Sequence, residues 1–123
     1  MHEFATAQSI IKTIKKVIEK EDVKRIYRIK LAVGELTFLN GEQLKFWIEE
    51  GLKGTVGEKA EILVKEVPAQ LRCQNCGYEG PIPLKEEPSF HFVLPVFACP
   101  KCEGVKIEII RGRDCEIEAL EVD

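Results

Sequence analysis

Four cysteines in two pairs carry the clearest chemistry in this chain of 123 residues. Cys73 and Cys76 form one CxxC unit, Cys99 and Cys102 form another, and 22 residues lie between the units. Each unit can turn two thiolates toward one ion, so the pair predicts a closed tetrahedral site with four sulfur ligands. Structural Zn(II) is typical of such a site, and iron in a rubredoxin-like electron carrier is an alternative. Bound metal would supply folding free energy that so short a segment cannot gain from a core.

The residues that follow the two CxxC units differ. Gly77 follows the first unit, where a tight turn needs a residue free to take unusual backbone angles. Glu103 occupies the equivalent place after the second unit, and Gly104 comes one residue later. We therefore expect a less regular turn in the second unit.

The fifth cysteine, Cys115, does not extend this pattern. It lies between Asp114 and Glu116 in a predicted strand, where acidic neighbours do not favour the thiolate. No acid/base pair or phosphate-binding loop is evident elsewhere in the sequence. We predict a protein that carries something and is not an enzyme, and the role of Cys115 stays undetermined.

The first three residues, "MHE", could bind a different metal. The α-amine of Met1 and the amide and imidazole nitrogens of His2 can close two chelate rings around Ni(II), which favours nitrogen-rich square-planar ligand sets. Glu3 offers a fourth donor through its amide nitrogen or carboxylate. Taken alone, the stretch is equally typical of a solvated terminus that frays.

Composition and charge argue against several classes of function. The net charge is -3, which argues against a protein that lies along phosphate backbones. Between Cys73 and Cys102 the only basic residues are Lys85 and Lys101, so a zinc-ribbon module for nucleic acid or protein interaction is the weaker alternative. No apolar run is long enough to span a membrane and no signal-peptide pattern is present, so we predict a cytoplasmic protein without a disulfide framework.

Apolar periodicity predicts the elements that position these residues. A helix is expected over 4–20, a long strand ending near Gly34, a second helix capped by Asn40 with Gln43 as its reciprocal partner, and a strand over 60–67. Two further alternating runs lie around "RGRD" within residues 105–122 and predict a hairpin or two successive strands. We predict an α+β fold in which two helices pack on a small mixed or antiparallel three-stranded sheet, with an inserted zinc-ribbon-like module. Residues 1–69 and 105–123 would form the α/β domain, and residues 70–104 the zinc module.

A second apolar run, "PSFHFVLPVF", contains His91 and lies inside the expected module. Its side chains would form the core of the module. Alternatively, the run would form a partner surface or an element exchanged between two chains in a homodimer. His91 would pack at the edge of that cluster.

Several stretches together resemble the HypA-type hydrogenase maturation nickel metallochaperones. They are "MHE", "VGEL" at the end of a strand, the second helix followed by "GT", "AEILVKEVPAQLRCQNCG" and "CPKC", and the long gap between CxxC units is similar to the archaeal form. The resemblance implies a nickel-binding α/β domain, a structural zinc module and delivery of Ni(II) as cargo to the hydrogenase large subunit, with a nucleotide-hydrolysing HypB-type partner. It also implies His91 as a further nickel ligand, a role that the residues alone leave open.

Overall fold

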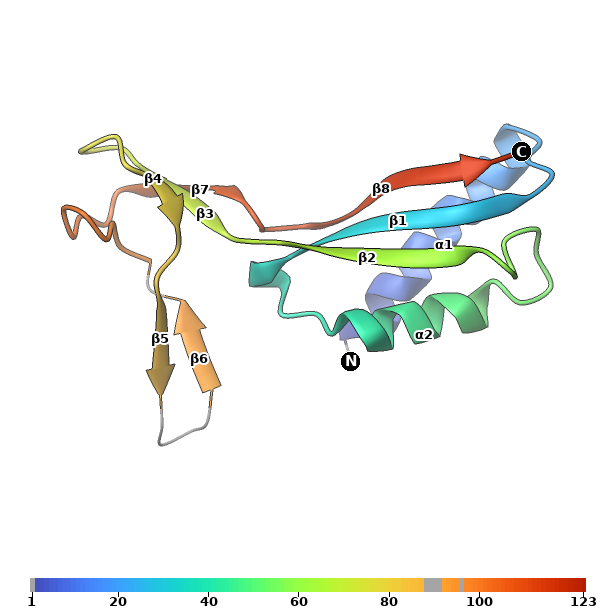
Figure 1. Ribbon diagram of the computed structural model, residues 1–123, viewed down its shortest axis with the longest axis horizontal. Helices are drawn as coiled ribbons and strands as arrows, with labels where there is room; N and C mark the ends of the chain where they lie inside the picture. Colours follow the sequence, from blue (N-terminus) through green and yellow to red (C-terminus); the bar gives the residue numbers. More distant parts are fainter. Residues whose placement is uncertain (1, 88–91, 96) are drawn as a thin grey trace.

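The computed structural model describes the backbone of residues 2–87, 92–95 and 97–123, and the side chains of residues 2–83 and 97–123. His91 and most of the apolar run around it lie outside the described side chains; Phe97 is described and is exposed. Figure 1 shows an elongated molecule in which both helices lie with one sheet and a smaller sheet lies at the opposite end. A two-stranded hairpin projects beside the smaller sheet.

Helix α1 (His2–Lys20) and strand β1 (Ile26–Gly34) confirm the two predicted elements at the start of the chain. Ala7, Ile10, Ile11 and Ile14 recur at helical spacing and are buried. In β1 the alternate residues Ile29, Leu31 and Val33 are buried, so one face of the strand packs on the helices. The opposite face carries ion pairs, with Arg28 at 3.0 Å from Glu121.

The second helix, α2 (Gly41–Gly51), begins at the predicted cap but with a different partner. The Asn40 side chain accepts a hydrogen bond from the Gln43 backbone N–H at 3.0 Å, as a helix cap should. The backbone N–H of Asn40 donates to the Glu3 carboxylate at 3.0 Å, where the sequence pattern predicted Gln43 as the acceptor. The first turns of α1 and α2 are therefore joined through Glu3.

The larger sheet has the order β2-β1-β8. Strand β2 (Glu61–Val67) is parallel to β1, and β8 (Cys115–Val122) is antiparallel to it, so the sheet is mixed, which is one of the two predicted arrangements. Figure 1 shows α1 behind this sheet and α2 beside β2. We call this group of two helices and three strands the large lobe. Its core contains thirteen buried hydrophobic residues.

The smaller sheet has the order β4-β3-β7, with antiparallel neighbours. Its strands are β3 (Gln70–Cys73), β4 (Glu79–Pro81) and β7 (Ile107–Arg111), and the separate hairpin contains β5 (Leu84–Glu87) and β6 (Phe92–Pro95). We call the smaller sheet and the two CxxC turns the small lobe. The two late strand signals are thus successive strands in different sheets, because β7 pairs with β3 and β8 with β1.

The lobes meet where two chain segments cross. The Gly34 N–H donates to the Asp114 carbonyl at 2.9 Å, and the Leu36 N–H donates to the Gly112 carbonyl at 2.9 Å. Gly112 has φ +82°, and a Cβ there would lie 2.6 Å from the Ala69 Cα, so only glycine fits without displacement. Leu36, from the short 3-10 helix η1 (Glu35–Thr37), packs against the core of the small lobe.

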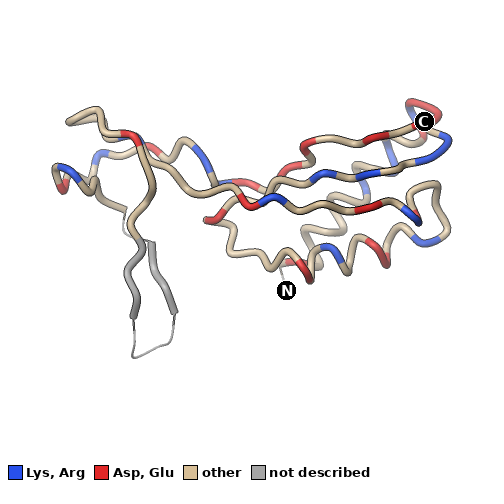
Figure 2. Tube along the Cα trace, viewed as in Figure 1, with Lys and Arg blue, Asp and Glu red and all other residues tan. Residues whose placement is uncertain are grey.

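Charged residues of both signs occur along the chain in both lobes (Figure 2). Within the described residues, no helix is both long enough and apolar enough to cross a membrane.

Candidate metal centres

The first CxxC turn starts at the end of β3. Cys73 is the last residue of that strand, and its backbone N–H donates to the Tyr78 carbonyl at 2.8 Å. The Gly77 N–H donates back to the Cys73 carbonyl at 3.0 Å, which closes the turn. Gly77 has φ +76°, so it takes the left-handed conformation that its position predicts.

The second CxxC turn has the same hydrogen-bond pattern. The Glu103 N–H donates to the Cys99 carbonyl at 2.8 Å, and the Cys99 N–H donates to the Gly104 carbonyl at 2.8 Å. Glu103 has φ +62° and therefore takes the place of Gly77 in the first turn. The expectation of a less regular second turn is wrong, because a non-glycine residue occupies the left-handed region here at a modest steric cost.

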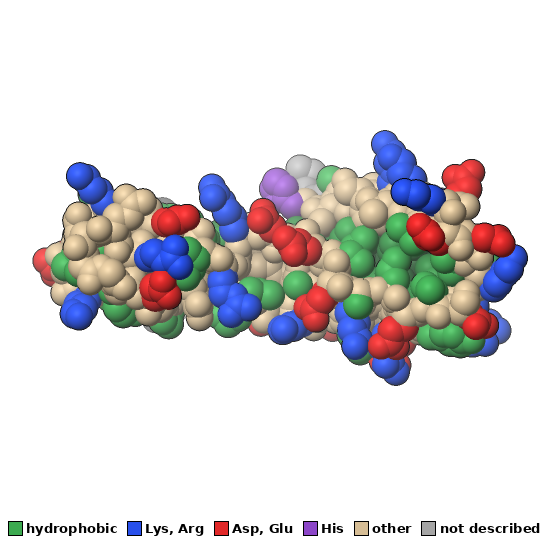
Figure 3. Space-filling model, turned by 90° about the horizontal axis from the view of Figure 1, so that it is seen from above, with side chains coloured by type: hydrophobic (Ala, Val, Ile, Leu, Met, Phe, Trp, Pro, Cys, Tyr) green, Lys and Arg blue, Asp and Glu red, His purple; other side chains and the backbone are tan. Residues whose placement is uncertain are grey.

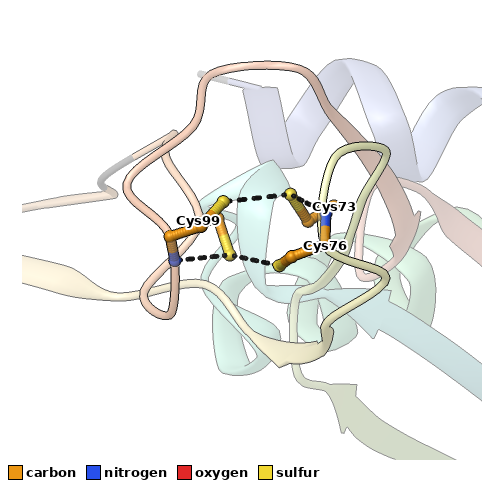
Figure 4. A group of neighbouring side chains, drawn as sticks. Cys73, Cys76 and Cys99 are labelled. Carbon is orange, nitrogen blue, oxygen red and sulfur yellow. Dashed lines mark hydrogen bonds between the residues drawn. The ribbon is translucent and has the colours of Figure 1, made fainter.

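The two turns bring all four sulfurs together (Figure 4). The Sγ atoms of Cys73 and Cys102 lie 3.6 Å apart, those of Cys76 and Cys99 lie 3.5 Å apart, and all four lie within 4.8 Å of one another. Tetrahedral sulfurs at a zinc–sulfur distance of about 2.3 Å would be separated by about 3.8 Å. The donor set and its spacing therefore fit one tetrahedral metal ion.

Backbone N–H groups also stabilise the thiolate form of two of the cysteines, Cys73 and Cys99, which favours binding of a cation. The Cys76 N–H donates to the Cys73 sulfur at 3.5 Å, and this contact is the main cause that lowers the pKa of Cys73 to about 6. Burial opposes ionisation at Cys99, but the N–H groups of Cys102 and Lys101 outweigh it and lower the pKa of that thiol. At Cys102 the Gly104 N–H favours the thiolate, yet the neighbouring sulfurs and burial raise its pKa to about 12. Four thiolates cannot coexist here without a positive ion.

His2 and Glu3 lie at the start of α1 in the large lobe, whereas the four cysteines lie in the two CxxC turns of the small lobe. The His2 side chain is exposed and lines a shallow depression with Thr6, Asp114 and Cys115. The Asn40 N–H is the main cause that lowers the pKa of Glu3 to about 2, so this carboxylate is ionised at neutral pH. Met1 and His91 lie outside the described residues.

Sequence reasoning missed two neighbours of this terminus. Asn40 and Asp114 are distant from Glu3 and His2 in the chain, and no sequence spacing marks their approach. Cys115 is separate from the four-cysteine cluster, and burial followed by the charge of Glu116 raises the pKa of its thiol. That shift agrees with the prediction that the position does not favour a thiolate.

The fold and cluster define a class of protein: a small α+β protein with a four-cysteine metal-binding module at one end. The HypA family model, described as hydrogenase/urease nickel incorporation metallochaperone, matches residues 1–122. The chain therefore belongs to the HypA family.

Curated relatives agree over the full length. A hydrogenase maturation factor HypA from Methanocaldococcus jannaschii is 37% identical, and the match covers 100% of this chain and 98% of the relative. A hydrogenase maturation factor HypA from Pyrococcus abyssi is 35% identical, with 100% and 96% covered.

Solved structures confirm the fold. The solution structure of the Ni metallochaperone HypA from Helicobacter pylori has a TM-score of 0.66 and 17% identity, over 98% of this chain and 96% of that one. Another solution structure of a HypA protein has a TM-score of 0.69 and 20% identity, over 99% and 96%.

Proposed function

We propose that this protein binds Ni(II) and delivers it during maturation of a nickel-iron hydrogenase. The observation that carries the proposal is the family match over residues 1–122. The protein would act as a carrier and not as an enzyme. Its partners would be a HypB-type nucleotide-hydrolysing protein and the hydrogenase large subunit, in the cytoplasm.

The nickel site would consist of the Met1 α-amine and the amide and imidazole nitrogens of His2. The amide N–H of His2 lies in the first turn of α1, where N–H groups have no acceptor within the helix. Nickel could displace that proton without breaking the helical hydrogen-bond ladder. The contact with Asn40 holds the Glu3 carboxylate at the same end of the helix, where it would help orient the ligands or donate to the ion.

The four-cysteine cluster would hold structural Zn(II) through Cys73, Cys76, Cys99 and Cys102. Zinc would neutralise the thiolates and join the two CxxC turns, and it would not exchange during nickel delivery. Residues 70–104 would form the zinc-binding module, and residues 1–69 with 105–123 would form the nickel-binding domain. Strand β7 falls within the second of these ranges, yet it pairs with β3 in the smaller sheet. His91 would be an additional nickel ligand, and exchange of the zinc module between chains would give a homodimer.

Metal analysis of the untagged protein tests the proposal. We expect one tightly held zinc ion per chain and one nickel ion that a chelator removes. Zinc without any nickel uptake would instead favour a zinc-ribbon interaction module. A strongly coloured protein would indicate iron at the four sulfurs.

A short N-terminal extension tests the nickel ligands. Adding Gly-Ser-Gly before Met1 moves the α-amine, so we expect nickel affinity to fall at least about tenfold with zinc content unchanged. The same three residues added after Asp123 provide the control. Equal nickel affinity in the two proteins would exclude the Met1 amine as a ligand. Unchanged affinity in His91→Ala would likewise exclude His91.

A further inference from the structure

Strand β8 is an edge of the larger sheet. It pairs with β1 on one side and with no other described strand. Figure 1 shows α2 beside β2 at the opposite edge, whereas β8 has no element alongside most of its outer edge. Long unpaired edges are usually shortened or covered because they invite another strand, and β8 extends over eight residues.

The hydrogen-bond pattern shows which backbone groups face outward. Gly34 and Asp114 form a hydrogen-bonded position, with the Gly34 N–H donating to the Asp114 carbonyl. Positions alternate in an antiparallel pair, so Cys115, opposite Val33, and Ile117, opposite Leu31, direct their N–H and carbonyl groups away from β1. These groups are available to an added strand.

An apolar trough runs beside this edge on the helix side. Cys115, Glu116 and Ile117 line a shallow depression of about 370 Å³ with Ser9, Ile10 and Thr13 of α1, and its apolar lining comes from Ile10, Cys115 and Ile117. Cys115 also lines the adjoining depression that contains His2. Figure 3, which looks onto the molecule from above Figure 1, shows hydrophobic side chains gathered on this part of the large lobe.

The other face of β8 is acidic. The strand "CEIEALEV" contains three glutamates and no basic residue. Glu121 is paired with Arg28 and Lys30, and Glu118 lies 3.9 Å from Lys65. Glu116 has no ion pair within the described part of the chain. A strand added to this edge would therefore meet apolar side chains on one face and the carboxylates of Glu116 and Glu118 on the other. Lys65, Arg111 and Arg113 line the same depression as these two glutamates.

We propose that the β8 edge binds an extended strand of a partner protein, in which apolar residues alternate with Lys or Arg. The apolar residues would cover the α1–β8 trough, and the basic residues would pair with Glu116 and Glu118. A second copy of this chain does not fit, because two β8 strands side by side would place glutamates against glutamates. The inference does not depend on nickel binding.

A labelled peptide tests this surface. The probe is an eight-residue peptide that alternates Lys with Val or Ile. The control peptide has Glu in place of each Lys. Fluorescence anisotropy should show the Lys peptide binding at least about tenfold more tightly to the zinc-loaded protein. Equal affinities, or no binding of either peptide, would overturn the proposal.

A charge-reversed protein locates the contact. Glu116→Lys with Glu118→Lys should reverse the preference, so that the Glu peptide binds more tightly. Glu42→Lys with Glu49→Lys makes the same change in net charge on exposed positions of α2 and should leave the preference unchanged. An identical response of the two variants would mean that net charge alone attracts the peptide.

Hydrogen exchange tests the backbone contact. The bound Lys peptide should slow exchange of the outward-facing amides of Cys115 and Ile117. Binding that leaves both amides unprotected would contradict strand addition. Self-association of the protein through β8 in the absence of peptide would also contradict the proposal, because the occupant of the edge would then be a second copy of this chain.

Discussion

The two lobes are stabilised by different interactions. Among the residues whose side chains the structure describes, the large lobe buries thirteen hydrophobic residues between two helices and a sheet, and the core cluster of the small lobe contains Ala69, Leu71 and Ile82. Two of its four cysteines, Cys73 and Cys99, are also almost completely buried. The larger described core fits a lobe that the hydrophobic effect stabilises, and we expect the small lobe to depend more on metal bound by its four cysteines. Four predictions test this contrast, beginning with the largest expected effect.

Loss of one of the proposed zinc ligands should unfold only the small lobe. Structural zinc contributes on the order of 10 kcal/mol of folding free energy in small modules, so Cys99→Ser should abolish zinc binding and ordered pairing of β3 with β7. NMR spectra should lose the dispersed amide signals of the small lobe and keep those of β1, β2 and most of β8. Cys115→Ser, outside the cluster, should retain zinc. Loss of both lobes in Cys99→Ser would show that the contrast is wrong.

A cavity in the core of the large lobe should destabilise that lobe and leave the small lobe intact. Ile14 is fully buried between the helices and the sheet, so Ile14→Ala should lower the free energy of unfolding by about 2–5 kcal/mol. Denaturation followed by the fluorescence of Trp47 would measure the change. Zinc content should remain at one ion per chain. Zinc loss in parallel with unfolding of the large lobe would indicate that the small lobe depends on it.

Removal of the α2 cap should have a smaller effect. Asn40→Ala removes the side-chain oxygen that accepts from the Gln43 N–H and should cost about 1 kcal/mol. The backbone N–H of residue 40 can still donate to Glu3, so nickel affinity should change little. Asn40→Ser keeps a cap and should restore most of the stability. A large loss of nickel affinity in both variants would assign the Asn40 side chain to the nickel site.

Lowering the pH should affect the two lobes at different pH values, and we expect this effect to be the smallest of the four. The pKa of Glu3 falls from 4.5 to about 2 in the folded chain, so its stabilising contact with Asn40 is fully present above pH 4.5. The contact should be lost as the pH falls through about 2, and the Asn40 amide shift should report that midpoint. Protons compete with zinc for the thiolates, so the small lobe should lose its metal at a higher pH. A midpoint near 4.5 for Asn40 would mean that the contact does not hold in solution.

Local patterns were sufficient for most elements. The apolar periodicity of residues 4–20, the cap at Asn40 and the break at Pro68 predicted α1, α2 and the end of β2 because neighbouring residues decide these features. The two CxxC units predicted a four-sulfur cluster for the same reason, since each unit positions its own two thiolates. Glu103 was the local exception, because a left-handed backbone at a non-glycine residue leaves no reliable mark in sequence.

The sequence by itself determined the element types, the four thiols that come together in one cluster and the likeness to nickel metallochaperones. Only the tertiary structure decided that β7 and β8 separate into two sheets, that Asn40 holds Glu3, and that β8 lies at an open edge beside α1. Helix periods, caps and CxxC turns involve residues a few positions apart. Strand partners and the Glu3–Asn40 contact join residues far apart in the chain, and packing of the whole fold selects them.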